Sequence, residues 1–435
     1  MNDGPQKTNA DRASNRSYRP GVIRTMRPHE LGSSFWMVWS ASTMSFIGNG
    51  FTAGAMPLLA LSITSDSRLI AAVNAVLMGG WILLGLISGV VVDRSDRLRV
   101  MWWVDAFRAL LMAGLTVAIF SSQVSMPVLL TLALLLGLAA PFFDNASSSV
   151  IPELVPHQWL EKANSWTQVP MLLATSLIGP PVGAVLFTMS HSAPFLLDAV
   201  TFAGSALLIA RLTTRRGRVQ RLSAGPDSPV RPWQMLKDGM VYLARHPTLR
   251  TLAVAAGMIN MVTGGVFAVL VLYTTQAMHL PGHAYGWLIA IFALGGVIGS
   301  LLTSRITSHL GMSAATIGSL MAFGVMAAVL GAVPRLPVAV PAIALGGIAS
   351  VVWNVVTISY RQRVVPGELL GRINSSYRMI SFAGIPVGAI GAGILSHEIG
   401  VAPTYLLGGL ALLIGGLAIA PSLRRMPRAA QASIQ

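Results

Sequence analysis

The sequence predicts an all-α membrane protein in which twelve transmembrane helices form two pseudo-symmetric bundles of six. Two observations lead to this fold class. Of the 435 residues, 54% are hydrophobic and only 10% are charged, whereas a soluble domain has about a quarter of its residues charged. The apolar residues also gather in twelve runs, each close to the roughly 20 residues that a helix needs to cross a bilayer.

The expected spans fall into two sets of six, separated by a polar, arginine-rich stretch at 213–248. Within this linker, Pro232 to Pro247 has the spacing of a short amphipathic helix that would lie against lipid headgroups. The chain thus divides into a basic tail (1–33), a first bundle (34–212), the linker, a second bundle (249–421) and a tail (422–435). The spans are 34–62, 70–92, 101–121, 126–149, 165–188, 194–212, 249–276, 284–304, 312–332, 338–360, 374–396 and 401–421.

The lysine and arginine residues lie almost entirely on one side of the expected membrane. Of the 30 lysine and arginine residues, only Arg68 and Arg335 lie in loops on the other side, and Arg108 lies inside a span. The arginines at 361–378 are counted with the basic side. Because positive loops stay in the cytoplasm, both termini are expected there, in a multi-pass protein of the inner or plasma membrane. The net charge of +15 suits anionic lipid headgroups as partners, and nucleic acid is not expected.

The two sets of spans repeat at an offset of 210 residues. At this offset Gly85 and Gly89 fall on Gly295 and Gly299. A glycine–proline segment of span five recurs in span eleven at an offset of 205, so the register of that span stays open. Since both sets start on the same side, the repeat is parallel, an arrangement in which a substrate site lies between the halves.

A charged turn joins spans two and three, with the sequence Gly89-Val-Val-Val-Asp93-Arg94-Ser-Asp96-Arg97-Leu-Arg99. Together with the two six-span halves and the basic linker, this turn resembles the major facilitator superfamily. The Asp-Arg-x-Asp-Arg form, the Asp-x-x-Arg that follows in span three, and Ile-Gly-Pro-Pro-Val-Gly at 178–183 are similar to the branch that contains enterobactin exporters and macrolide-efflux proteins.

The resemblance implies that Asp93, Arg94 and Arg97 form a latch that closes the cytoplasmic side. Asp93 would pair with one of these arginines, or meet the positive N-terminus of span eleven; the alternative is a solvated turn. In span five, Pro180 between Gly179 and Gly183 predicts a kink with close helix contacts. The resemblance implies that this kinked span serves export, and simple packing is the alternative.

Four ionisable residues are expected inside the spans as candidates for a proton or ion-pair site: Asp105, Arg108, Asp144 and Asp198. Charges within a bilayer are costly and usually paired, and the i,i+3 spacing of Asp105 and Arg108 predicts an ion pair. Asp144 either faces the cytoplasmic mouth or pairs with a basic turn residue. Asp198 either holds a proton or bonds to the backbone of a neighbouring helix. Related exporters often have an acid where Asn49 stands, so proton coupling would depend on the aspartates.

The substrate-cavity candidates are polar and aromatic residues: Asn49, Phe143, Asn260, Trp353 and Asn354. With few fixed charges, the cavity is expected to be apolar and to suit a bulky amphipathic compound. The chain has no cysteine and no glycine-rich phosphate loop with lysine, and its one close histidine pair is separated by Pro281-Gly282. No enzyme activity, cofactor or metal is therefore expected.

The sequence is interpreted as a monomeric secondary active transporter that exports a small amphipathic compound of the drug, macrolide or siderophore type. The expected mechanism is alternating access, coupled to protons. Two alternatives stay open: a solute uptake facilitator on the same fold, and a lipid-handling or non-transporting membrane protein.

Overall fold

The computed structural model describes residues 31–215 and 232–424, and within these residues the secondary structure is helical, without a strand. The remaining parts of both predicted tails and of the linker lie outside the described residues. The helices of the first half are α1 (Gly32–Ile63), α2 (Ser67–Asp93), α3 (Arg97–Phe120), α4 (Met126–Leu154), η2 (His157–Trp159), α5 (Leu160–Leu172), η3 (Leu173–Ile178), α6 (Gly179–Met189) and α7 (Ala193–Arg215). Those that follow are α8 (Pro232–Arg245), α9 (Pro247–Ala268), α10 (Leu270–Leu272), η4 (Tyr273–Ala277), α11 (Ala284–Ala332), α12 (Leu336–Val364), α13 (Gly367–Ile399) and α14 (Val401–Leu423).

The described helices make the twelve crossings that the sequence predicts. Eleven helical segments are long and apolar enough to span a membrane. One of these segments, α11 with 49 residues, contains two crossings. At 1.5 Å per residue it is far longer than a hydrocarbon core of about 30 Å requires. Its direction changes at Gly311, where φ is 78°, a conformation open to glycine. This break separates the spans expected at 284–304 and 312–332.

Aspartate caps define where two of the helices begin. Asp66 accepts a hydrogen bond from the backbone N–H of Arg68 at the start of α2. Asp96 accepts from the backbone of Leu98 and Arg99 at the start of α3. An N-cap of this kind contributes about 1 kcal/mol to helix stability. Asp96 of the charged turn therefore serves as the N-cap of α3.

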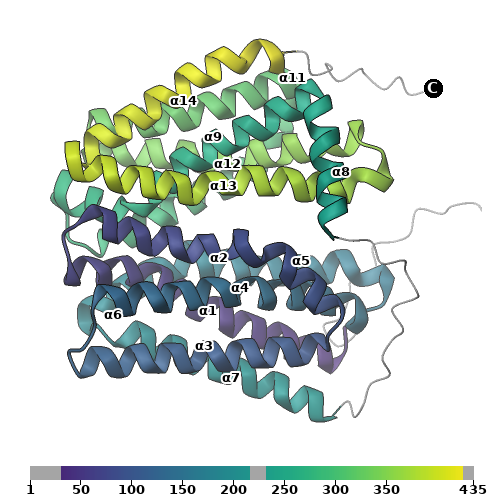
Figure 1. Ribbon diagram of the computed structural model, residues 1–435, viewed down its shortest axis with the longest axis vertical. Helices are drawn as coiled ribbons and strands as arrows, with labels where there is room; N and C mark the ends of the chain where they lie inside the picture. Colours follow the sequence, from purple (N-terminus) through teal and green to yellow (C-terminus); the bar gives the residue numbers. More distant parts are fainter. Residues whose placement is uncertain (1–30, 216–231, 425–435) are drawn as a thin grey trace, which may run out of the picture.

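Figure 1 shows two bundles of helices, one formed by α1–α7 and the other by α9–α14. The bundles meet where α2 packs along α13 and where α6 packs against α11. The end of the bundles at which α2 finishes at Asp93, and at which α8 lies, is called the basic face below. The end at which α2 starts at Ser67 is called the opposite face.

Close helix packing resolves the register of span eleven. A Cβ at Gly54 of α1 would lie 2.1 Å from the carbonyl oxygen of Pro180. In the second half, a Cβ at Gly264 of α9 would lie 2.6 Å from the carbonyl oxygen of Ile385. Gly54 and Gly264 are related by the offset of 210, whereas Pro180 and Ile385 are related by 205. The packing of span eleven against span seven therefore follows the offset of 205.

Candidate transport site

A buried ion pair lies inside the first bundle. Arg108 Nη1 is 3.6 Å from Asp105 Oδ1, and these α3 side chains are 3% and 0% exposed. Ser45 of α1 donates a hydrogen bond to Asp105 Oδ1 at 3.4 Å. The rings of Phe143 (α4) and Phe202 (α7) each lie 5.5 Å from the Arg108 guanidinium carbon. The ion pair that the i,i+3 spacing predicts is formed, and three neighbouring helices enclose it.

Asp198 of α7 lies in the same bundle and is 1% exposed. Its carboxylate accepts a hydrogen bond from Thr52 of α1, and its backbone carbonyl accepts one from Thr201 at 2.8 Å. Gly48 leaves room for this carboxylate, because a Cβ there would lie 2.0 Å from Asp198 Oδ1. Asp198 therefore does form a hydrogen bond with a neighbouring helix. Its partner is the side chain of Thr52, whereas the sequence suggested a backbone group.

Asp144 of α4 is half-buried, and its side chain has no hydrogen bond or ion pair with a described residue. Of the three carboxylates, that of Asp105 forms an ion pair with Arg108, and those of Asp144 and Asp198 have no ion pair with a described residue. If all three were ionised, two negative charges would lack a counter-ion, which is costly in a region of low dielectric. Protonation of one or two carboxylates removes that cost.

Span five is interrupted where the sequence predicts a kink. The π-helical segment Leu173–Ile178 precedes α6, which starts at Gly179 and Pro180. Proline has no N–H, so the regular helical hydrogen bond is lost at this point. A Cβ at Gly183 would lie 2.2 Å from a carbonyl oxygen of α1, and one at Gly286 of α11 would lie 2.6 Å from that of Pro180. Helices of both halves therefore contact the interrupted segment closely.

The charged turn does not form the ion pairs of a latch in this conformation. Asp93 and Arg94 are exposed, and their side chains have no hydrogen bond or ion pair with a described residue. Arg97 donates to the carbonyl of Ser149 at 2.8 Å and forms an ion pair with Glu153, both on α4. The contacts of Arg97 therefore stay within the first half.

The five cavity candidates do not share one surface. Phe143 and Trp353 are 0% and 5% exposed and lie in the helix packing. Asn260 of α9 donates hydrogen bonds of 2.6 and 2.9 Å to α13. Asn354 is exposed and donates to a carbonyl of its own helix at 2.9 Å, and Asn49 is half-buried on α1. In this conformation Phe143 contributes to the surroundings of Arg108.

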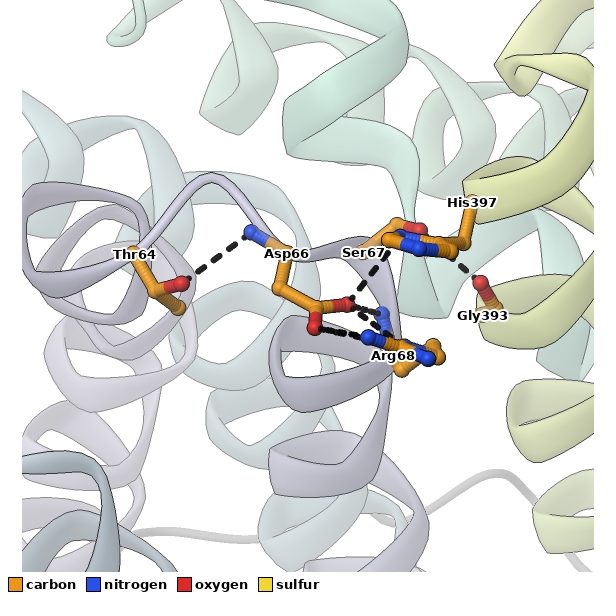
Figure 2. A network of polar contacts seen from close by, with 6 residues as sticks. All are labelled: Thr64, Asp66, Ser67, Arg68, Gly393 and His397. Carbon is orange, nitrogen blue, oxygen red and sulfur yellow. Dashed lines mark hydrogen bonds and ion pairs between the residues drawn. The ribbon is translucent and has the colours of Figure 1, made fainter.

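At the opposite face the two halves are joined by polar contacts. Ser67 at the start of α2 donates to the carbonyl of Gly393 on α13 at 2.8 Å. His397 Nδ1, also on α13, lies 3.6 Å from Asp66 Oδ1. Figure 2 shows the Asp66 carboxylate directed toward both His397 and Arg68. The hydrogen bonds from Arg68 lower the pKa of Asp66 to about 2, so this carboxylate is ionised at neutral pH.

One group between the halves was not singled out from the sequence. Arg378 of α13 lies beside Trp81 of α2 and Phe382, with Asn145 of α4 nearby, around a cavity of about 130 Å³. The expected span eleven, 374–396, already contained Arg378, although this arginine was counted with the basic residues at 361–378. Because α13 begins at Gly367, Arg378 lies well inside the helix. A signal was present in the i,i+4 spacing of Arg378 and Phe382, which places both on one helix face.

The arrangement of the helices is that of a multi-pass membrane protein with the major facilitator fold. The chain belongs to the family described as transmembrane secretion effectors, which it matches over residues 28–435. It is 27% identical over 421 residues to the multidrug efflux pump Tap of Mycolicibacterium fortuitum, with 91% of this chain and 97% of the relative covered. It is 26% identical over 407 residues to the enterobactin exporter EntS of Salmonella paratyphi A (strain ATCC 9150 / SARB42), with 92% and 94% covered.

Solved structures share the fold. A bacterial homologue of the iron transporter ferroportin, in an inward-facing state, superposes with a TM-score of 0.69 at 16% identity, covering 89% of this chain and 98% of that one. The all-α major facilitator fold and the resemblance to its drug and siderophore exporters are both confirmed.

Proposed function

We propose that the protein is a monomeric secondary active transporter that exports small amphipathic compounds of the drug, macrolide or siderophore type across the inner or plasma membrane. The family and the efflux activity named in two relatives support this proposal. The mechanism is alternating access, in which the two bundles rock about a substrate site between them.

The observation that carries the proposal is the unequal contact between the halves at the two faces. At the opposite face Ser67 bonds to α13 at 2.8 Å. Tyr285 of α11 donates to the carbonyl of Ala53 on α1 at 3.1 Å. At the basic face the side chains of Asp93 and Arg94 are exposed. Polar contacts between the halves at the opposite face, with an exposed charged turn at the basic face, are what one end state of a rocking transporter is expected to have.

The distribution of basic residues favours a cytoplasmic position for the basic face and for both termini. The structure would then represent the inward-open state. In the outward-open state, Asp93 would approach the N-terminal end of α13 and act as the latch with Arg94 and Arg97. The basic residues of this face and α8, where Lys237 and Arg245 are exposed, suit anionic lipid headgroups.

We assign proton coupling to the buried cluster of the first bundle. Among the described residues Asp105 pairs with Arg108, while Asp144 and Asp198 have no ion-pair partner. Asp105 Oδ2 also makes no hydrogen bond within the described residues, so it offers a position for a proton. A change in the number of bound protons would alter the packing of α3, α4 and α7 against α1.

The test is accumulation of macrolides, siderophores and aromatic dyes in cells with and without the protein, repeated with a proton uncoupler. Lower accumulation that the uncoupler abolishes is the expected result. Asp198→Asn keeps an acceptor for Thr52 but cannot ionise, and should remove the uncoupler-sensitive component. Arg335→Gln, in a loop at the opposite face, is the control that should retain it. Higher accumulation of a compound would instead indicate uptake, and no effect on any compound would contradict transport.

A further inference from the structure

An arginine without a counter-charge lies between the two halves. Arg378 is exposed, and none of the described carboxylates lies within ion-pair distance of it. Its guanidinium carbon lies 5.8 Å from the Trp81 ring centre and 5.4 Å from that of Phe382. Arg108, by contrast, is 3% exposed and paired with Asp105. Arg378 is therefore positioned by aromatic rings, while its charge is not neutralised.

The position of Arg378 is well inside the membrane-spanning helices. It lies about five residues from the middle of α13 (Gly367–Ile399), or roughly 8 Å at 1.5 Å per residue, and a hydrocarbon core extends roughly 15 Å on each side of its centre. Its partner ring, Trp81, is close to the middle of α2 (Ser67–Asp93). An ionised side chain at this depth is costly and by default indicates a functional site.

The cavity beside Arg378 has a shape and lining that suit an anion. Its volume is about 130 Å³, and its described lining residues include no acid. Gly85 and Asn145 also line the cavity. Asn145 Nδ2 donates to Ser88 Oγ at 2.8 Å and to the Gly85 carbonyl at 3.5 Å, so Arg378 supplies the charge that would attract an anion. Whole drug-sized ligands occupy about 300–1,000 Å³, so this cavity fits one charged end of such a compound.

We propose that this cavity, called the Arg378 site (Trp81, Asn145, Arg378 and Phe382), binds the acidic group of an aromatic organic anion; as a substrate site it rests on the proposed transport function. The rings of Trp81 and Phe382 lie near the guanidinium, and no described residue accepts a hydrogen bond from it, so its N–H donors can form two parallel hydrogen bonds to an oxyanion. Trp81 and Phe382 supply apolar surface for the aromatic body. Since Trp81 and Arg378 come from different halves, the bound anion contacts both.

The proposal is tested by calorimetric binding to the full chain in nanodiscs of zwitterionic lipid, with two probes of similar shape and opposite charge. The probes are 2-naphthalenesulfonate and 2-naphthyltrimethylammonium. The wild-type protein should bind the sulfonate at least tenfold more tightly than the ammonium probe. Arg378→Gln should weaken sulfonate binding roughly 10- to 100-fold, the range that a hydrogen-bonded charge pair supports, and leave ammonium binding unchanged or tighter.

Two further variants separate recognition from folding. Arg378→Lys keeps the charge but not the paired donors, and should retain part of the preference for the sulfonate. Arg335→Gln, which removes an exposed arginine outside the cavity, should bind as the wild type does, and thermal unfolding of each variant shows whether it is folded. Equal binding of the two probes by the wild type, or unchanged sulfonate binding by folded Arg378→Gln, overturns the proposal.

Binding in nanodiscs does not require transport, so the two proposals fail in different ways. If cells show no efflux but the sulfonate binds with the expected dependence on Arg378, the proposed export is wrong and the anion site stands. If efflux is present but sulfonate binding does not depend on Arg378, the inference about the Arg378 site is wrong and export stands.

Discussion

The two bundles share a backbone repeat but differ in the charges that they contain. The first bundle encloses one arginine and three aspartates at positions 105, 108, 144 and 198. At the offset of 210, the corresponding residues of the second bundle are Ala315, Gly318, Asn354 and Gly408. None of these can carry a proton or a charge at neutral pH. The second bundle instead contains Arg361, which is 7% exposed and has its guanidinium carbon 3.7 Å from the Tyr377 ring centre, and Arg378, which is exposed between the halves.

This difference indicates that a repeat preserves helix packing more readily than chemistry. Close backbone contacts recur in both halves, as for Gly54 on Pro180 and Gly264 on Ile385, because helices can approach only where side chains are small. Charged side chains away from these close contacts are not restricted in this way, so they can differ between the two halves. Under our proposals, protons bind inside the first bundle while the substrate anion contacts both halves, so proton and substrate would occupy separate sites.

The comparison predicts its largest effect at Asp105. Asp105→Ala leaves Arg108 buried without its partner, and an uncompensated buried charge of this kind costs about 3–5 kcal/mol. Asn354→Ala, at the position equivalent to Asp144, removes an exposed amide and should cost less than about 0.5 kcal/mol. Thermal unfolding in detergent measures the difference. Adding Arg108→Met to Asp105→Leu should recover most of the lost stability, and failure of this rescue would show that the ion pair itself is required.

The next effect concerns two glycines related by the repeat. A Cβ at Gly299 would lie 2.7 Å from the carbonyl oxygen of Ile348, whereas one at Gly89 would have nothing within 4 Å. Gly299→Ala should therefore destabilise the protein by about 1–3 kcal/mol through overpacking. Gly89→Ala should be neutral, or stabilise helix α2 by up to about 1 kcal/mol. Equal effects of the two substitutions in an unfolding assay would contradict the asymmetry.

The sequence was sufficient for the helices and insufficient for the contacts between them. The hydropathy pattern predicted all twelve spans, and the spacing of Asp105 and Arg108 predicted their ion pair. The hydrogen bond from Thr52 to Asp198 joins residues 146 positions apart, so no local pattern contains it. Gly48 indicated that another group packs closely against this span, because glycine has no side chain. The sequence alone does not show that this group is Asp198.

Arg378 shows a second reason for the limits of prediction. Polar residues at the start of a membrane helix lower its apparent hydropathy, so the expected span eleven began at 374, whereas α13 begins at Gly367. Arg378 then lay close to the expected end of the span and was counted with the basic residues of the loop. Only the three-dimensional arrangement of α2 against α13, which places Trp81 beside the guanidinium, reveals that it lies at the interface between the halves.

A smaller effect is expected at the one-sided charged turn. Thr303 stands in the second half where Asp93 stands in the first, and its hydroxyl bonds to its own helix at 2.6 Å. Asp93→Asn should leave insertion and stability unchanged, because its carboxylate is exposed, but slow transport by roughly three- to tenfold if the latch forms in the other state. Thr303→Val should leave transport within about twofold. Normal efflux by Asp93→Asn would mean that the turn is only solvated.

The smallest effect concerns the polar contacts at the opposite face, which join the halves through Asp66. The pKa of this carboxyl is lowered from 3.8 to about 2 by its hydrogen bonds with Arg68. A lowered pKa stabilises the folded state above the unfolded value and loses this contribution as the pH falls through the folded value. Asp66→Asn keeps a good N-cap for α2 and removes only the charge. Its melting temperature should therefore lie slightly below that of the wild type at pH 5–7, with the difference disappearing between about pH 4 and 2. A difference that persists at pH 2 would show that the loss comes from the cap or from packing and not from the charge of Asp66.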